Sequence, residues 1–164
     1  VRMNSLIKPY VLVANGVNLD LLGRREKVFY GDYTLKDVEH HVHNLKDDIA
    51  KICGFAEGCD IYFFQTNDES AFLEKISQPC DGIVLNAGAW AHTSLALSDR
   101  FAALKIPFVE IHLSNLSQRE PYRHTSFISS LALGVVYGFG LHTYSIGLMA
   151  ILTKIKELQG QGMT

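Results

Sequence analysis

Short apolar runs alternate along the chain with segments whose apolar residues recur every three or four positions. The runs at residues 10–14, 61–64, 83–85, 108–113 and 134–137 have the length and composition of buried strands. From residue 34 to 52 the apolar steps of three and four predict a helix with Thr34 as its N-cap. Further helices are expected at about 72–76, from 93–94 to 104, and at about 144–158.

Strand and helix alternate about five times, which predicts a parallel sheet covered by helices on both faces. The expected fold is α/β, a flavodoxin-like three-layer sandwich with a parallel sheet of about five strands. Since no linker or repeat interrupts the 164 residues, we expect one domain over residues 1–164, with about 1–9 as a short N-terminal extension.

The composition argues against several classes of binding partner and against a membrane or secreted location. With 15 Lys and Arg against 17 Asp and Glu, the net charge of −2 offers no basic footprint for nucleic acid or an anionic membrane. Apolar runs are too short to span a bilayer, and residues 1–8 lack the pattern of a secretory leader. The three cysteines have no CxxC spacing and are expected to be reduced thiols, so a cytoplasmic location is the expectation.

Polar residues gather where the predicted strands end. Residues 15–18 (Asn-Gly-Val-Asn) follow the first strand, 65–67 (Gln-Thr-Asn) the second and 86–88 (Asn-Ala-Gly) the third, and the fourth ends near His112 and residues 114–115 (Ser-Asn). In open parallel sheets, ligands bind outside the carboxyl ends of the strands. This edge of the sheet is therefore the expected site.

Several familiar chemistries lack their motifs. Neither GxGxxG nor GxxxxGK[ST] is present, so the chain lacks the usual phosphate-binding loops for dinucleotides and nucleoside triphosphates. It also lacks the GxSxG nucleophile elbow of α/β-hydrolases. A phosphoacceptor receiver domain needs an aspartate after the third strand, where this chain has Asn86. The cluster of His40, His41 and His43 suggests a metal site, but no third ligand of suitable spacing lies near, and a solvated helix surface is favoured.

Two loops carry groups suited to a small anion. LGRREKVFYG contains Arg24, Arg25 and Tyr30, and SQREPYRHTS contains two further arginines and a histidine. Each arginine alone could be surface charge, but two such loops after strand ends favour binding of a carboxylate or phosphate. The predicted partner is a small anionic substrate.

The fourth strand places Glu110 two residues before His112. Alternate residues of a strand share a face, so the two side chains should project together. The spacing suits either a structural ion pair or a carboxylate that supports a catalytic histidine.

Longer blocks resemble the type II 3-dehydroquinate dehydratases (type II dehydroquinases). ANGVNLDLLGRREKVFYG is similar to the family's GPNLN-LGxREPxxYG, FFQTN to FQSN, and LNAGAWAHTSLALSD to NPGAxTHTSxAxxD. VEIHLSNLSQREPYRHTSF is similar to EVHxSNxxxREpFRxxS, and GVVYGFGLHTY matches the glycine-rich segment before the last helix. The blocks occur in the family's order and cover nearly the whole chain.

The resemblance implies a hydro-lyase that converts 3-dehydroquinate reversibly to 3-dehydroshikimate through an enolate, without a metal or cofactor. It implies that Tyr30 removes the proton alpha to the ketone and that Arg25, rather than Arg24, favours the phenolate. His112 is implied as the general acid, with Glu110 setting its protonation. The fifth implied catalytic residue, which holds a water against the enolate oxygen, is Asn18.

The resemblance also implies the residues that bind the substrate. It implies that Asn86, His92 and Asp99 form hydrogen bonds with the substrate hydroxyls, with Asp99 reaching the site of a neighbouring subunit. It implies that the main-chain N–H groups of Leu113 and Ser114, and the Ser114 hydroxyl, bind the substrate carboxylate. Arg123 is implied to bind hydroxyl or carboxylate oxygens of the substrate, and Arg119 to be a mobile or supporting contact. Gly88 is implied to allow close approach of the main chain. The role of His124 is left open.

The resemblance further implies trimers that assemble into a homododecamer, in either shikimate biosynthesis or quinate breakdown. Three positions depart from the family pattern: Val17 and Lys27 replace prolines, and Ser70 replaces a common glycine. These substitutions should change how well ordered the loops are, but none of them removes a chemical group of the implied active site. Two other hypotheses stay open, a flavodoxin-like module that binds an anion or flavin without catalysis, and a family member with a changed substrate.

Overall fold

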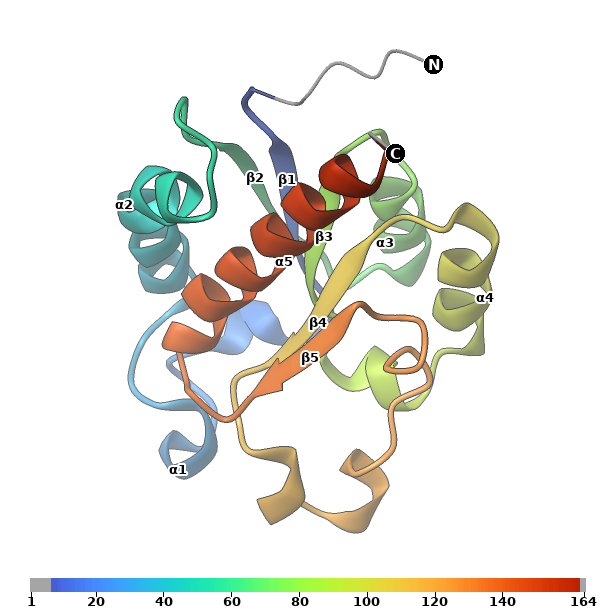
Figure 1. The fold of residues 1–164 in the computed structure, drawn as a ribbon. Helices are drawn as coiled ribbons and strands as arrows, with labels where there is room; N and C mark the ends of the chain where they lie inside the picture. The colour runs from blue at the N-terminus through green and yellow to red at the C-terminus, as the bar shows by residue number, and fades with distance from the viewer. Residues whose placement is uncertain (1–6, 163–164) are drawn as a thin grey trace.

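The computed structural model describes residues 7–162, which form a parallel five-stranded sheet between two layers of helices (Figure 1). The strand order is β2-β1-β3-β4-β5, and all neighbouring pairs are parallel. The strands are β1 (Tyr10–Asn15), β2 (Asp60–Gln65), β3 (Gly82–Asn86), β4 (Phe108–His112) and β5 (Gly134–Tyr137). This order is that of flavodoxin-like folds, so the predicted fold class is confirmed.

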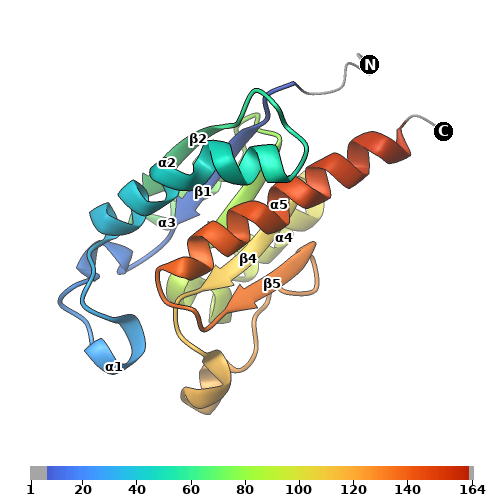
Figure 2. The same cartoon turned by 60° about the vertical axis from the view of Figure 1, so that its left-hand side comes forward.

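Two helices cover each face of the sheet. Helices α2 (Leu35–Ile52) and α5 (His142–Gln161) pack on one face, where Figure 2 shows them in front of the strands. Helices α3 (Glu69–Ile76) and α4 (Leu95–Leu104) pack on the other. The strands alternate their side chains between the two resulting cores, as in Val11 and Val13 against Leu12 and Ala14.

Helix α2 begins where the sequence predicted. The Thr34 hydroxyl accepts from the main-chain N–H of Asp37, and the Asp37 carboxylate accepts from the main-chain N–H of Thr34 at 2.8 Å. This reciprocal cap satisfies two of the amides that a helix start leaves unpaired. The periodic apolar residues Val38, Val42 and Ile49 are buried against the sheet.

Some helix bounds, and one short helix, differ from the predicted elements. Helix α5 begins at His142 and runs to Gln161, beyond the expected 144–158. The four-residue helix α1 (Lys27–Tyr30) was not predicted, because one turn is too short to show periodicity. Residues 1–6 of the expected N-terminal extension lie outside the described residues, while Lys8 pairs with Asp60 at 2.9 Å at the start of β2.

The carboxyl ends of the strands lie in register at one edge of the sheet. Asn15 at the end of β1 is aligned with Gln65 of β2 on one side and with Asn86 of β3 on the other. At Gly16 a Cβ atom would lie 2.4 Å from the main-chain oxygen of Ala87, so only glycine allows the two loops to meet. Strand order reverses at β1, and the connections on either side open a crevice there.

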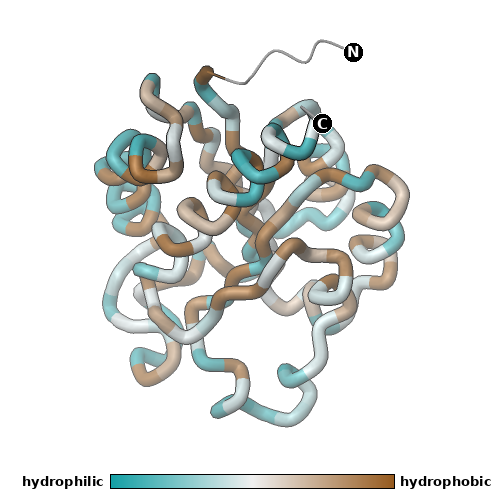
Figure 3. Tube along the Cα trace, in the orientation of Figure 1, coloured by the Kyte–Doolittle hydropathy of each residue, from teal (hydrophilic) through white to brown (hydrophobic). Residues whose placement is uncertain are grey.

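The apolar residues follow this architecture. In Figure 3 the central strands are largely brown, and the loops below their carboxyl ends are mostly white and teal. Among residues 7–162, no helix combines the length and the apolar character needed to cross a membrane.

Candidate active site

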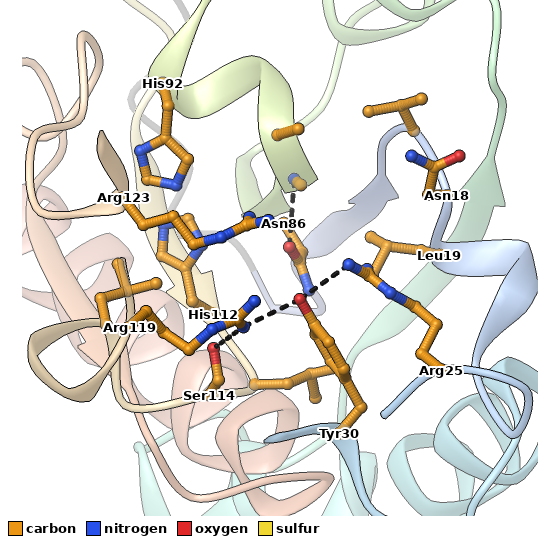
Figure 4. Close-up of a pocket in the computed structure, with 15 residues that line it drawn as sticks. Asn18, Leu19, Arg25, Tyr30, Asn86, His92, His112, Ser114, Arg119 and Arg123 are labelled. Carbon is orange, nitrogen blue, oxygen red and sulfur yellow. Dashed lines mark hydrogen bonds between the residues drawn. The ribbon is translucent and has the colours of Figure 1, made fainter. Parts of the chain in front are cut away.

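A polar pocket lies at the carboxyl ends of β1, β3 and β4 (Figure 4). Its empty volume is about 540 Å³, part of it open to solvent. Eleven of the thirteen residues that the sequence singled out line it: Asn18, Arg25, Tyr30, Asn86, Gly88, His92, His112, Leu113, Ser114, Arg119 and Arg123. The other lining residues are Val17, Leu19, Ala89 and Leu116.

The Tyr30 hydroxyl lies between two guanidinium groups. It accepts a hydrogen bond from Arg25 Nη2 at 2.8 Å and one from Arg119 Nη1 at 2.9 Å. Arg25 Cζ also lies 3.8 Å from the centre of the Tyr30 ring. Tyr30 itself is buried at the end of α1. Two guanidinium groups therefore donate to one phenol oxygen.

Arg119 is held from several sides. Its Nη1 also donates to Ser114 Oγ at 3.0 Å, and its Nε donates to Glu120 at 3.2 Å. His124, which the sequence left unassigned, lies with Nε2 at 2.9 Å from the main-chain oxygen of Arg119. Burial lowers the pKa of Arg119, but the contacts with Tyr30 and Glu120 outweigh it and raise that pKa, so the guanidinium stays charged.

Glu110 and His112 form the buried pair that their spacing predicted. His112 Nε2 lies 3.0 Å from Glu110 Oε1. Glu110 is fully buried, and it also accepts from the hydroxyls of Ser126, at 2.6 Å, and of Ser129. Burial raises the pKa of Glu110, but the hydrogen bond and charge of His112 and the two serine hydroxyls hold that pKa below its ordinary value. The carboxylate is therefore ionised at neutral pH.

The His92 ring stacks on the His112 ring, with centroids 5.7 Å apart. Its Nδ1 lies 2.8 Å from the main-chain oxygen of Thr125. A carbonyl only accepts, so Nδ1 carries the hydrogen and Nε2 is an acceptor in the neutral ring. Burial is the main cause that lowers the pKa of His92; the hydrogen bond to Thr125 opposes it, and the nearby His112 and Arg123 side chains lower that pKa further. His92 is thus neutral at physiological pH.

The wall formed by β1 and β3 is built from amides and a glycine. Gly88 has φ +61°, and its main-chain N–H donates to Asn86 Oδ1 at 3.2 Å. A Cβ at Gly88 would lie 2.7 Å from the main-chain oxygen of Val17, so glycine is required there. Asn18 has φ 65°, and its main-chain N–H donates to Asn67 Oδ1 at 2.8 Å. These contacts set the turn that carries Asn18.

Two of the thirteen predicted residues do not line the pocket. Glu110 lies behind His112, and Asp99 is exposed on α4. Sequence patterns did not point to Ser126 and Ser129, which donate to Glu110, or to Thr125, whose main-chain oxygen accepts from His92; all three lie before β5. The one signal for them was their position at the end of the basic segment SQREPYRHTS, or three residues after it in the case of Ser129.

The histidine cluster on α2 lies elsewhere. His41 Nε2 is 3.0 Å from Ser145 Oγ, and its ring meets that of His142 edge-on. His43 Nε2 is 3.8 Å from Glu39. Within residues 7–162, no group of three or more His, Cys, Asp or Glu side chains is arranged to hold a metal ion.

The pocket brings together side chains that are chemically able to accept and to donate a proton. A phenol flanked by guanidinium groups lies on one wall, and a histidine backed by a buried carboxylate lies on another. Main-chain and side-chain donors between them suit a polar, negatively charged ligand. Such an arrangement suits proton abstraction next to a carbonyl, coupled to loss of a hydroxyl.

Comparison with known proteins gives consistent results. The profile of the family described as "Dehydroquinase class II" matches residues 9–152. A protein named "3-dehydroquinate dehydratase 2" from Pseudomonas putida is 42% identical over 157 residues, covering 92% of this chain and 98% of that protein. A "3-dehydroquinate dehydratase" from Prochlorococcus marinus is 40% identical over 151 residues, covering 90% and 99%.

Solved structures agree with the sequence relatives. The type II dehydroquinase from Butyrivibrio crossotus superimposes with a TM-score of 0.79 at 32% identity, covering 88% of this chain and 97% of that one. The type II dehydroquinase from Propionibacterium acnes gives a TM-score of 0.76 at 33% identity, covering 91% and 99%. Both matches span nearly all of each chain.

Proposed function

The chain belongs to the class II dehydroquinase family, and we propose that it is a 3-dehydroquinate dehydratase with Tyr30 as base and His112 as acid. The reaction is the reversible anti elimination of water from 3-dehydroquinate, through an enolate, to 3-dehydroshikimate. The observation that carries the mechanism is the Tyr30 hydroxyl between two guanidinium groups, in the same pocket as the His112–Glu110 pair.

Tyr30 acts first. A free tyrosine is almost entirely protonated at neutral pH, so a tyrosine base needs positive charge nearby. Arg25 and Arg119 each donate a hydrogen bond to the Tyr30 oxygen, and such bonds strengthen when the acceptor is ionised. The phenolate takes the proton alpha to the ketone, and the electron pair of that C–H bond forms the enolate.

The enolate oxygen needs a donor in the pocket. Asn18 lines the pocket from the turn after β1, and its left-handed main chain is fixed by the hydrogen bond to Asn67. We assign to Asn18 the role of holding a water molecule against this oxygen. Preorganised donors of this kind stabilise developing charge without reorganisation.

His112 completes the elimination. Because Nε2 faces Glu110, Nδ1 is the ring nitrogen left for the substrate. Glu110 is ionised and can only accept, so the Nε2 hydrogen of His112 points to its carboxylate. The imidazolium gives the Nδ1 proton to the departing hydroxyl, which leaves as water while the C–O bond electrons go to oxygen.

The remaining lining residues bind the substrate. Ser114 Oγ accepts from Arg119, so its own hydrogen points elsewhere and is available to a carboxylate, together with the main-chain N–H groups of Leu113 and Ser114. His92 Nε2 accepts from a substrate hydroxyl, because Nδ1 is used on Thr125. Asn86 forms a hydrogen bond with a second substrate hydroxyl, and Arg123 donates hydrogen bonds to substrate oxygens.

We propose that Asp99 serves the pocket of a neighbouring subunit in a dodecamer built of trimers. Its exposure on α4, outside the pocket of its own chain, supports this role. Apolar side chains in and around β5 are also exposed, as expected of a surface that another subunit covers: Leu131, Leu133, Val135, Tyr137 and Phe139. Light scattering that reports a monomer at assay concentration would contradict the assembly.

The direct test is turnover. Purified protein mixed with 3-dehydroquinate should produce the conjugated enone, followed as rising ultraviolet absorbance. The rate should be unchanged by a metal chelator or by borohydride, because the proposed steps use neither a metal nor an imine. Tyr30→Phe should lose at least about 1,000-fold in kcat, since the base is removed, while still binding the substrate.

The matched control is Tyr62→Phe, which removes a phenol hydroxyl from the exposed face of β2 and should keep full activity. Binding without turnover in the folded wild type would favour a non-catalytic binding module. A Tyr30→Phe variant that keeps wild-type kcat would overturn the assignment of the base.

A further inference from the structure

A chain of buried hydrogen bonds runs behind the pocket from β2 to the loop after β3. Asn15 Nδ2 donates to the main-chain oxygen of Phe64 at 3.0 Å, and Tyr144 Oη donates to Asn15 Oδ1 at 2.6 Å. Asn86 Nδ2 donates to Tyr144 Oη at 2.9 Å, and Gly88 N donates to Asn86 Oδ1 at 3.2 Å. The chain therefore ends on a residue of the pocket wall.

The direction of every bond in this chain is set by its two ends. The Phe64 carbonyl can only accept, so the Asn15 amide nitrogen must face it and Asn15 Oδ1 must face Tyr144. The Gly88 N–H can only donate, so Asn86 Oδ1 must face it and Asn86 Nδ2 must face Tyr144. The Tyr144 hydroxyl then accepts from one amide and donates to the other.

Burial makes this arrangement costly to break. Asn15, Tyr144 and Asn86 are 0%, 1% and 3% exposed. Burial raises the pKa of Tyr144 far above its ordinary value, so the hydroxyl keeps its hydrogen and can both donate and accept. A flip of the Asn86 amide would set its nitrogen against the Gly88 N–H and its oxygen toward a hydroxyl already committed to Asn15.

We propose that Tyr144 and Asn15 are positioning residues that hold the Asn86 amide in one orientation for a substrate hydroxyl. The inference rests on the proposed function, in which Asn86 lines the pocket and binds that hydroxyl. With one Nδ2 hydrogen committed to Tyr144 and one Oδ1 lone pair committed to Gly88, the plane of the amide is fixed. Only the second hydrogen and the second lone pair remain for a ligand.

The test is the kinetics of Tyr144→Phe, which removes the central hydroxyl and keeps the ring. KM for 3-dehydroquinate should rise about tenfold with kcat within about twofold of wild type, since contacts to a hydroxyl present throughout the reaction act on binding. Leu148→Val is the matched control, because it trims a buried side chain of the same helix outside the hydrogen-bond chain. It should lower the unfolding temperature and leave KM unchanged.

A double-mutant cycle separates positioning from a loss of stability. If Tyr144 acts through Asn86, then Tyr144→Phe should add no more than about a twofold rise in KM to the Asn86→Ala variant. A tenfold rise in both backgrounds would overturn the proposal. An unchanged KM in the single Tyr144→Phe variant, with the fold intact, would overturn it as well.

A readout independent of turnover keeps this inference distinct from the proposed function. The side-chain NH2 of Asn86 should exchange with solvent slowly in wild-type protein and at least tenfold faster in Tyr144→Phe, as followed by NMR. Rapid exchange in the wild type would contradict the positioning role. Slow exchange in a wild type that does not turn over 3-dehydroquinate would instead contradict the proposed reaction and leave the orientation of Asn86 supported.

Discussion

Arg119 donates a hydrogen bond from Nη1 to the Tyr30 hydroxyl at 2.9 Å, although 89 positions separate the two residues. Arg25, only five positions before Tyr30, approaches the same oxygen at 2.8 Å. The two basic loops that the sequence marked as candidate anion sites therefore converge on one phenol. One of these loops follows β1 and the other follows β4, and the parallel sheet brings both to the same edge.

The first prediction concerns these two arginines. Arg25→Met and Arg119→Met should each lower kcat about 10- to 100-fold, because a hydrogen bond to a charged group is worth about 1.5–3 kcal/mol. Steady-state kinetics measures the loss. Arg24→Met is the matched control: Arg24 is exposed and adjacent to Arg25, and its substitution should leave kcat unchanged. If Arg119→Met retains the wild-type rate, the second arginine has no part in activating Tyr30.

The second prediction concerns stability at acid pH. The folded-state pKa of Glu110 lies below its ordinary value of 4.5, so its carboxylate stabilises the fold above that pH and the contribution is lost as pH falls through the lower value. Ser126→Ala removes a hydrogen bond to this carboxylate and should raise the pKa of Glu110. Since the folded and unfolded pKa values would then lie closer together, the loss of stability on acidification should be smaller and should end at a higher pH than in the wild type.

Urea unfolding between about pH 3 and 7 measures this effect. Ser77→Ala serves as the control, because it removes a serine hydrogen bond at the end of α3, to the main chain of Leu73. Its stability should fall by a similar amount at every pH. Parallel curves for wild type and both variants would show that Ser126 does not act on the Glu110 carboxylate.

The third prediction concerns the glycine after β3. Gly88→Ala should destabilise the fold by about 1–3 kcal/mol and raise KM, since a Cβ there meets the Val17 carbonyl in a left-handed conformation and displaces the N–H that Asn86 accepts. Urea unfolding and steady-state kinetics measure the two effects. Gly160→Ala, in α5 with open space around its Cβ position, should be neutral or slightly stabilising. Equal stability of the two variants would contradict the prediction.

The fourth prediction concerns a departure from the family pattern. Lys27 stands where the family has proline, and the structure places it as the first residue of α1, where a proline's fixed φ fits and the N–H has no acceptor in the helix. Glu26, with ψ 112°, is close to the conformation that a following proline favours. Lys27→Pro should therefore stabilise the loop by about 0.4–1 kcal/mol.

Limited chymotrypsin cleavage near Phe29 and Tyr30 measures the order of this loop, and Lys27→Pro should slow it. The control Lys27→Ala removes the exposed ion pair with Asp32, 2.7 Å in length, without fixing φ. Cleavage of Lys27→Ala should stay near the wild-type rate. Faster cleavage of Lys27→Pro would show that the loop does not keep the α1 conformation.

Local sequence patterns were enough to predict the helices, the strands and the pairs of residues close in the chain. Short apolar runs predicted the five strands, and apolar steps of three and four residues predicted the long helix capped by Thr34, because both patterns reflect which side chains face a core. The two-residue spacing of Glu110 and His112 predicted a shared face, and His112 Nε2 lies 3.0 Å from the carboxylate. The family resemblance named the pocket residues, and their roles in catalysis stay predictions.

Contacts between residues far apart in the chain follow from the tertiary structure and could not be predicted from local patterns. Three hydrogen bonds show this: Arg119 to Tyr30 joins residues 89 positions apart, Ser129 to Glu110 joins residues 19 apart, and Tyr144 to Asn15 joins residues 129 apart. Such contacts depend on strand order and on helix packing across the sheet, and neither leaves a periodic signal in the sequence. The physical reason is that a buried polar group takes whichever partner the packed chain brings within hydrogen-bond distance.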